Sequence, residues 1–242
     1  MKRSIVLFFA GIILFSVSGN SQEVTLDQVL SAYYKANGIE KMKEWQTITS
    51  SGKSIVGGQE FPFTMIMKRP GKMRVEAEIQ KMKMIQSFDG EKGWSVMPWT
   101  GSTDAQEMTA DEVKSLKHQS DPEGALYNWK EKGSKVELLG KEDMEGTSVF
   151  KIKLTRADGD VEDYYIDAES YVPLKMTTKT KIQGNETEAE SYFSNYKDIN
   201  GVLMASTITS KVKDQVVSQI VIDKVETNLP VDDSLFIKPV KK

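Results

Sequence analysis

The sequence predicts a mainly β protein whose large antiparallel sheet, of roughly eleven or twelve strands, is accompanied by a few helices. Apolar and polar residues alternate with a period of two over three consecutive runs between residues 61 and 88, which is the pattern of half-buried strands. Turn dipeptides such as Asp89-Gly90, Asp158-Gly159 and Asn200-Gly201 separate further runs of this kind. Helical spacing is confined to a segment near the N-terminus and to an insert in the middle of the chain. With 242 residues, the chain is long enough for one large β domain.

The helical segment near the N-terminus is expected to begin at Thr25, a good N-cap residue, with Asp27 in the first turn. Asn37-Gly38 ends this helix, and a short second helix is expected from Ile39 to Trp45.

The insert begins with Thr109 and Glu112, which have the spacing of a capping box. A second short helix is expected at residues 121–133, "DPEGALYNWKEKG". Strands are expected at residues 47–56, 60–68, 72–79, 82–88, 93–97, 135–140, 147–155, 161–167, 171–180, 187–196, 203–213 and 215–226.

The stretch "MIMKRPGKMRVEAEIQKMKMIQSFDGEKGW", residues 65–94, concentrates methionine on one face of neighbouring strands. Methionine packs poorly into a rigid core and well into a surface that must adapt to its contents. We therefore interpret this face as the wall of a lipid-binding cavity; the alternative is an ordinary core between sheet and helix. The interpretation requires Lys68, Arg74, Glu76 and Lys83 to face outward. The expected wall residues are Phe61, Phe63, Met65, Met67, Met73, Met82, Met84, Phe88 and Trp94.

The size of the sheet supports a cavity for an independent reason. An eight-stranded barrel can just fill its interior with its own side chains. A strongly curved sheet of more strands leaves an interior that helices must plug or a ligand must occupy.

The first residues predict export. Lys2 and Arg3 precede an apolar run from Ile5 to Val17 and then small residues, so residues 1–21 are expected to be a cleaved signal peptide; the alternative is an uncleaved N-terminal anchor. The chain has no cysteine, so a lipid anchor is not expected. Removing Lys2 and Arg3 from the 32 basic residues leaves 30 against 35 acidic ones, a net charge of −5. This charge argues against a nucleic-acid partner.

Residues that could perform chemistry are few. His118 is the only histidine, and we expect it to be a solvated residue at a polar helix end. Asp158, Asp160 and Glu162 alternate as in a calcium loop but lack its other ligands, so a hairpin turn explains them better. The sequence therefore nominates no catalytic residue, no metal ligand and no cofactor, and predicts that the protein is not an enzyme.

The segment "MIMKRPGKMRVE", followed by "SFDGEKGWSVMPW", resembles the LolA/LolB-like group of periplasmic lipoprotein carriers and their outer-membrane receptors, often called outer-membrane lipoprotein-sorting proteins. The N-terminal helix after a signal peptide, the insert of short helices and the ending "NLPVDDSLFIKP" also fit that group. The resemblance covers about residues 25–240.

The resemblance implies an unclosed antiparallel β-barrel of about eleven strands, with a lid of helices over a hydrophobic cavity that holds acyl chains. Residues 22–242 would form this single domain. Arg69 stands where the carriers have an arginine that hydrogen-bonds to the lid; the alternative is a plain strand-end charge. Met73 stands where the group has an aromatic residue, so an aromatic role is not carried over. Some relatives instead carry glycolipids or sense envelope stress.

The sequence as a whole thus predicts a periplasmic carrier, not lipid-anchored, for acyl chains of lipoproteins or other envelope lipids. The resemblance implies transfer partners in the inner and outer membranes, and we expect a monomer. The alternative is a sensor or scaffold that binds a protein partner and transports nothing. An enzyme acting on envelope lipids or glycans is a third class, for which the sequence nominates no catalytic residue.

Overall fold

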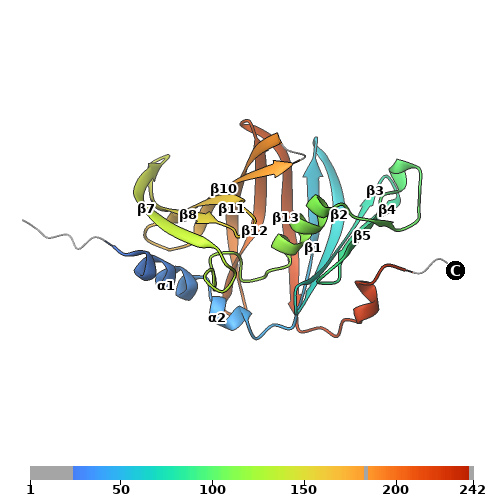
Figure 1. Ribbon diagram of the computed structural model, residues 1–242, viewed down its shortest axis with the longest axis horizontal. Helices are drawn as coiled ribbons and strands as arrows, with labels where there is room; N and C mark the ends of the chain where they lie inside the picture. Colours follow the sequence, from blue (N-terminus) through green and yellow to red (C-terminus); the bar gives the residue numbers. More distant parts are fainter. Residues whose placement is uncertain (1–23, 183–184, 240–242) are drawn as a thin grey trace, which may run out of the picture.

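Thirteen antiparallel strands form one curved sheet within residues 24–182 and 185–239, the part of the chain that the computed structural model describes (Figure 1). The order across the sheet is β6-β5-β4-β3-β2-β1-β13-β12-β11-β10-β9-β8-β7. Strands β6 and β7 lie at its opposite ends, so the barrel is unclosed, which confirms the predicted fold class. The predicted signal peptide, residues 1–21, lies outside the described residues.

The strands follow the predicted runs closely, with the two-residue β6 as the main addition. Their bounds are β1 (Thr47–Val56), β2 (Gln59–Lys68), β3 (Lys72–Ile79), β4 (Met82–Phe88), β5 (Gly93–Val96), β6 (Gln106–Glu107), β7 (Lys135–Met144), β8 (Thr147–Thr155), β9 (Val161–Asp167), β10 (Pro173–Ile182), β11 (Asn185–Ile199), β12 (Val202–Val212) and β13 (Gln215–Thr227).

The helices are short. They are α1 (Leu26–Ala36), α2 (Ile39–Met42), α3 (Ala110–Gln119) and the 3-10 turns η1 (Pro98–Thr100) and η2 (Asp233–Leu235). Both α1 and α3 start with a complete capping box, on Thr25 and Thr109, so the side chain at N3 and the cap satisfy each other's backbone donors.

The helix predicted at residues 121–133 is wrong, because this segment forms a series of turns. Gly124 and Asn128 have positive φ values of 74° and 49°, which a helix cannot contain. The second helix also ends at Met42 and not at Trp45.

One face of the sheet, here called the inner face, carries the apolar residues that the helices contact. Met67, Met73 and Phe88 are partners across β2, β3 and β4, and they pack with Leu116 of α3. At the other end of the sheet, α1 packs on residues of β7, β8 and β9. The strand register places both groups on the same face, and α3 also contacts the turn between β8 and β9. The sheet therefore curves around its helices.

The opposite, outer face is covered at one end by the C-terminal segment, residues 228–239. Phe236 is fully buried there. Its carbonyl oxygen accepts a hydrogen bond of 2.8 Å from Trp94 Nε1, and the carbonyl of Leu235 accepts one of 2.6 Å from Arg74 Nη1. The segment that ends the resemblance to the carriers thus closes the outer side of β3 to β5.

Replacing Phe236 with alanine should lower the free energy of unfolding by about 3–5 kcal/mol, because a fully buried phenyl ring leaves a cavity. Urea unfolding followed by tryptophan fluorescence measures the loss. Ile237→Ala is the matched control, since Ile237 is 57% exposed and should change little. Equal losses in the two variants would mean that the C-terminal segment is not anchored by Phe236.

Candidate functional site

The wall predicted from the sequence lies on the inner face, with one exception. Cα pairing places eight of the nine predicted residues there, on β2, β3 and β4. The ninth, Trp94, is wrong: it pairs with Ser87 on the outer face and is buried by the C-terminal segment. Lys68 alternates with inner Met67, so it belongs to the outer face.

The charged residues of these strands face outward, as the interpretation required. Glu76 forms two ion pairs on the outer face. Arg74 Nη2 lies 2.6 Å from its Oε1, and Lys83 Nζ lies 2.7 Å from its Oε2. The inner face of β2 to β4 is left to residues without charge, with Gln86 as a polar side chain among the apolar ones.

One half of the wall is closed by α3. Met73 and Phe88 are buried against Leu116, and Met65 and Met67 pack at the margin of this cluster with Val113. Gly93, the partner of Phe88, allows the close fit: a Cβ atom there would lie 2.7 Å from Met108 Sδ and 3.1 Å from Val113 Cγ2. Methionine and helix therefore meet where the sequence predicted a lid.

The other half of the wall is open. Phe61, Phe63, Met82 and Met84 lie near the hairpin ends of β2 and β4, on the same inner face. They are only partly buried, and none belongs to a buried cluster among the described residues. An apolar surface thus continues from beneath α3 toward one rim of the sheet.

A small void lies beneath the segment that follows α3. It measures about 10 Å³, room for about one water molecule, and its lining includes Trp45, Ile48, Met67 and Arg69. Another void, of about 20 Å³, lies farther along the sheet between Met204 of β12 and Ile222 of β13. An acyl chain can occupy the closed half of the wall only if α3 or the segment after it moves.

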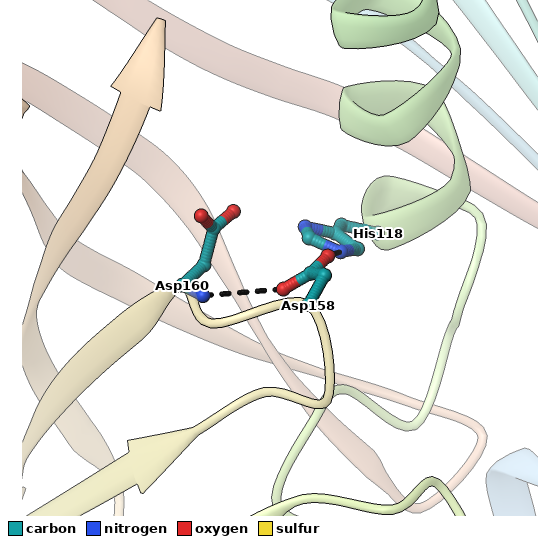
Figure 2. A group of neighbouring side chains, drawn as sticks. All are labelled: His118, Asp158 and Asp160. Atoms are coloured by element: carbon teal, nitrogen blue, oxygen red, sulfur yellow. Dashed lines mark hydrogen bonds and ion pairs between the residues drawn. The ribbon is translucent and has the colours of Figure 1, made fainter. Parts of the chain in front are cut away.

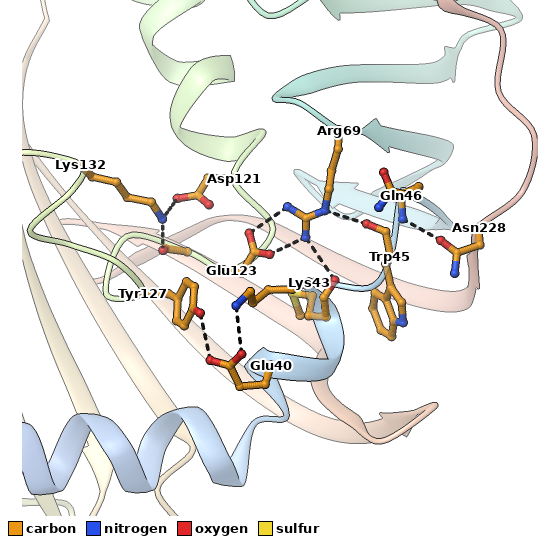
Figure 3. A network of polar contacts seen from close by, with 12 residues as sticks. Glu40, Lys43, Trp45, Gln46, Arg69, Asp121, Glu123, Tyr127, Lys132 and Asn228 are labelled. Atoms are coloured by element: carbon orange, nitrogen blue, oxygen red, sulfur yellow. Dashed lines mark hydrogen bonds and ion pairs between the residues drawn. The ribbon is translucent and has the colours of Figure 1, made fainter.

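Arg69, at the end of β2, ties this region together (Figure 3). Its Nε donates to the carbonyl of Trp45 at 2.7 Å, and its Nη2 donates to the carbonyl of Met42 at 3.1 Å. Both guanidinium Nη atoms also bond the carboxylate of Glu123, in the turn segment that follows α3. A guanidinium makes several directed bonds at once, so one side chain joins β2, the end of α2 and the segment after α3. We call this group the Arg69 bridge.

Glu123 is a site residue that the sequence did not nominate. It is buried, with a side chain only 8% exposed, and its partner Arg69 lies 54 residues away. The sequence around Glu123 contains no pattern that predicts a buried ion pair. Glu123 is simply an acidic residue that follows a proline in a polar insert.

A second group of charges joins α3 to the turn between β8 and β9 (Figure 2). His118 Nε2 lies 2.9 Å from Asp158 Oδ2, and Lys114 Nζ lies 2.7 Å from Asp160 Oδ2 and 3.8 Å from Asp158 Oδ2. We call these four residues the α3–hairpin contact. The expectation of a solvated His118 is wrong, because its side chain is only 24% exposed.

The α3–hairpin contact was also considered as a metal site. One ligand atom each from His118, Asp158 and Asp160 lies within 4.8 Å of the others. The Lys114 ammonium already lies between the two carboxylates at ion-pair distances, so the positive charge that this group binds comes from the chain itself. Glu162 takes no part: it pairs with Arg156 at 2.7 Å and accepts the Tyr164 hydroxyl at 2.6 Å. Asp158 and Gly159 form the predicted hairpin turn.

Burial sets the charge state of this contact. Desolvation and the nearby Arg156 guanidinium lower the pKa of His118 below its ordinary value, although Asp158 opposes them. The pKa of Asp158 is also lowered: burial would raise it, and its bonds to the Asp160 amide, His118 and Lys114 outweigh that effect. At neutral pH, therefore, a neutral imidazole faces an ionised carboxylate.

Comparison with known proteins identifies the fold. No family model matches the sequence, and no curated protein matches it. A LolA-superfamily protein from Nitrosomonas europaea superposes with a TM-score of 0.60 at 15% identity, over 89% of this chain and 98% of that one. A DUF1329-family protein from Desulfovibrio piger gives 0.59 at 12%, over 86% and 97%. A domain named for outer-membrane lipoprotein sorting, from Vibrio parahaemolyticus, gives 0.54 at 10%, over 84% and 97%.

The chain thus has the unclosed half-barrel fold of LolA-superfamily structures, as the resemblance implied. The described helices include none that is long and apolar enough to span a membrane.

Replacing Glu123 with glutamine should loosen the segment after α3, because a buried charge-assisted bond contributes about 1.5–3 kcal/mol. Amide exchange measured by mass spectrometry should become faster in residues 120–126. Glu60→Gln is the matched control, since Glu60 and Lys53 form an exposed pair on β1 and β2, which makes no contact with that segment. Unchanged exchange in Glu123→Gln would show that the Arg69 bridge does not hold this segment.

The free energy of unfolding should fall on acidification through the His118 titration. The unfolded chain takes up the proton near its ordinary pKa of 6.5, and the folded chain resists it to a lower pH. Stability from this group is therefore complete above about pH 7 and declines below about pH 6.5. Urea unfolding at several pH values should show a smaller decline in His118→Gln than in the unchanged protein. Equal declines would contradict the prediction.

Proposed function

We propose that this protein is a periplasmic carrier that holds acyl chains of lipoproteins or other envelope lipids against the inner face of its sheet and helps deliver them to the outer membrane. The observation that carries the proposal is the apolar wall on β2 to β4. It continues without a charged side chain from the open residues Phe61, Phe63 and Met84 to residues covered by α3.

Hydrophobic transfer alone can supply the affinity. Each buried CH2 group contributes about 0.8 kcal/mol, so a long acyl chain can bind without a specific polar contact. Methionine side chains adapt to chains of different shape. The packing of Leu116 on Met73 and Phe88, and the void of only about 10 Å³ beside Met67, imply a closed state that must open before the covered half receives cargo. The Arg69 bridge would hold the lid in that state.

The comparisons support this proposal through the fold and through the printed name of one similar domain, lipoprotein sorting. The proposal includes a signal peptide at residues 1–21, a single half-barrel domain at residues 22–242 and a monomer. Its partners would be the lipid itself and transfer proteins of the inner and outer membranes, with no nucleic acid. The role is binding, not catalysis.

A sensor or scaffold is the second candidate, and the burial of Met73 and Phe88 against Leu116 favours it. If α3 never leaves Met73 and Phe88, the lid is part of the core. The open half of the wall would then receive a protein partner in place of lipid.

Mass spectrometry of an organic extract should detect near-stoichiometric lipid in the protein purified after export without detergent. Met84→Asp should reduce both the bound lipid and the uptake of a fluorescent fatty-acyl probe, because it places a charge on the open wall. Thr64→Asp is the matched control, since Thr64 lies on the outer face of β2, which β3 separates from β4.

A protein that is lipid-free and also fails to take up the probe would overturn the carrier proposal and favour the sensor. If Met84→Asp and Thr64→Asp lose equal amounts of bound lipid, the lipid does not bind at the inner wall. Circular dichroism of each variant establishes that it remains folded.

A further inference from the structure

Helix α3 contacts two parts of the sheet that lie far apart in strand order. Its apolar residues pack on β3 and β4, whereas its charged residues contact the turn between β8 and β9. Six strands, from β2 through β1 and β13 to β10, separate these parts in the sheet. Figure 1 shows α3 in front of the central strands. The helix therefore bridges the concave side of the half-barrel.

The two contacts use different sides of the helix. Val113 and Leu116 are three residues apart and share the apolar side. Lys114 and His118 are four residues apart and share another side, directed at Asp158 and Asp160. One side of α3 thus covers the wall. The other side fastens the helix to the opposite half of the sheet, and Figure 2 shows His118 of α3 facing Asp158 there.

We propose that the α3–hairpin contact is a second fastening of the lid, which must separate for an acyl chain to reach the wall beneath α3. This inference rests on the proposed function. Lys114, His118, Asp158 and Asp160 would then be positioning residues: they set how readily the lid opens and touch no lipid themselves.

The chemistry of the two contacts suits a lid that opens and closes. An entering acyl chain can replace the apolar contacts that Met73 and Phe88 lose when α3 moves away. The charged contact has no such replacement in the lipid. Water can supply one for three of its side chains, because Lys114, His118 and Asp158 are 31%, 24% and 36% exposed, whereas Asp160 is 9% exposed. The contacts that Asp158 makes are therefore partly hydrated, and such pairs are weak and reversible.

The groups around His118 leave the carboxylates of the turn facing α3. The groups that face it are Asp158, Arg156 and Glu162 from the β8–β9 region, with Lys114 on its own helix. Since Arg156 is committed to Glu162 at 2.7 Å, the two carboxylates of the turn remain for Lys114 and His118.

The absence of cysteine from the chain allows a direct test. In the variant His118→Cys with Asp158→Cys, a short reducible bis-maleimide cross-linker would tie α3 to the hairpin. We expect the cross-linked protein to take up a fluorescent fatty-acyl probe at least about tenfold more slowly than the unlinked protein, and reduction of the linker to restore the rate. The same linker in Lys53→Cys with Glu60→Cys is the matched control, because it joins adjacent strands β1 and β2 across an exposed ion pair.

A second variant weakens the fastening without adding a tether, since Lys114 keeps its ion pair with Asp160 at 2.7 Å. Asp158→Asn should speed probe uptake by roughly two- to fivefold, the effect of losing a partly exposed ion pair. Amide exchange in α3 should become faster by a similar factor. This variant also covers the case in which the double-cysteine protein fails to fold.

The outcomes separate the inference from the proposed function. Uptake by the cross-linked protein at the unlinked rate would overturn the fastening and leave the carrier role intact. Failure of the unchanged protein to take up the probe would overturn the carrier role. In that case, unchanged amide exchange of α3 in Asp158→Asn would overturn the fastening as well.

Discussion

The structure depends on burying the apolar inner face of its sheet. The sheet has too many strands for its own side chains to fill the concave side. Thirteen strands in one unclosed sheet leave an apolar concave surface that cannot be filled by its own side chains. The cover comes from α1 at the β7–β9 end and from α3 at the β3–β5 end. The cover at the α3 end is incomplete, and the methionines and phenylalanines of β2 and β4 remain partly exposed there. The proposed lipid site is the direct consequence of this shortage.

Packing and charge have separate roles in this cover. Apolar contacts decide where α3 lies, because Leu116 meets Met73 and Phe88 at a place where Gly93 leaves room. Charges decide how firmly the cover is held. The Arg69 bridge joins three segments through one guanidinium, whereas the α3–hairpin contact joins two segments through separate pairs. A lid held by more bonds on one side than on the other has a defined side on which to open.

Most of the wall could be predicted because a strand's alternation fixes its two faces. Met65 and Met67 alternate correctly along β2, and Met82 and Met84 along β4. The register of β2, β3 and β4 then places them on one face with Met73. Trp94 was misplaced because the turn at residues 89–92 resets the parity: Gly93 becomes the inner partner of Phe88, and Trp94 falls on the outer face. The alternation within a strand shows which residues share a face of that strand. It does not show which of these faces lies on the same side of the sheet as a given face of the next strand, because the loop between them can reverse the order.

The sequence by itself determined the class of fold, the order of the strands along the chain and the apolar character of the inner face, because these follow from periodicities of two and 3.6 and from caps and turns. Only the tertiary structure decided which charges meet. Arg69 finds Glu123 across 54 residues, and His118 finds Asp158 across 40, after the sheet has curved enough to bring its two halves to one helix. Such pairs leave no periodic trace, since a charge at the end of a strand looks the same whether it faces water or a distant partner.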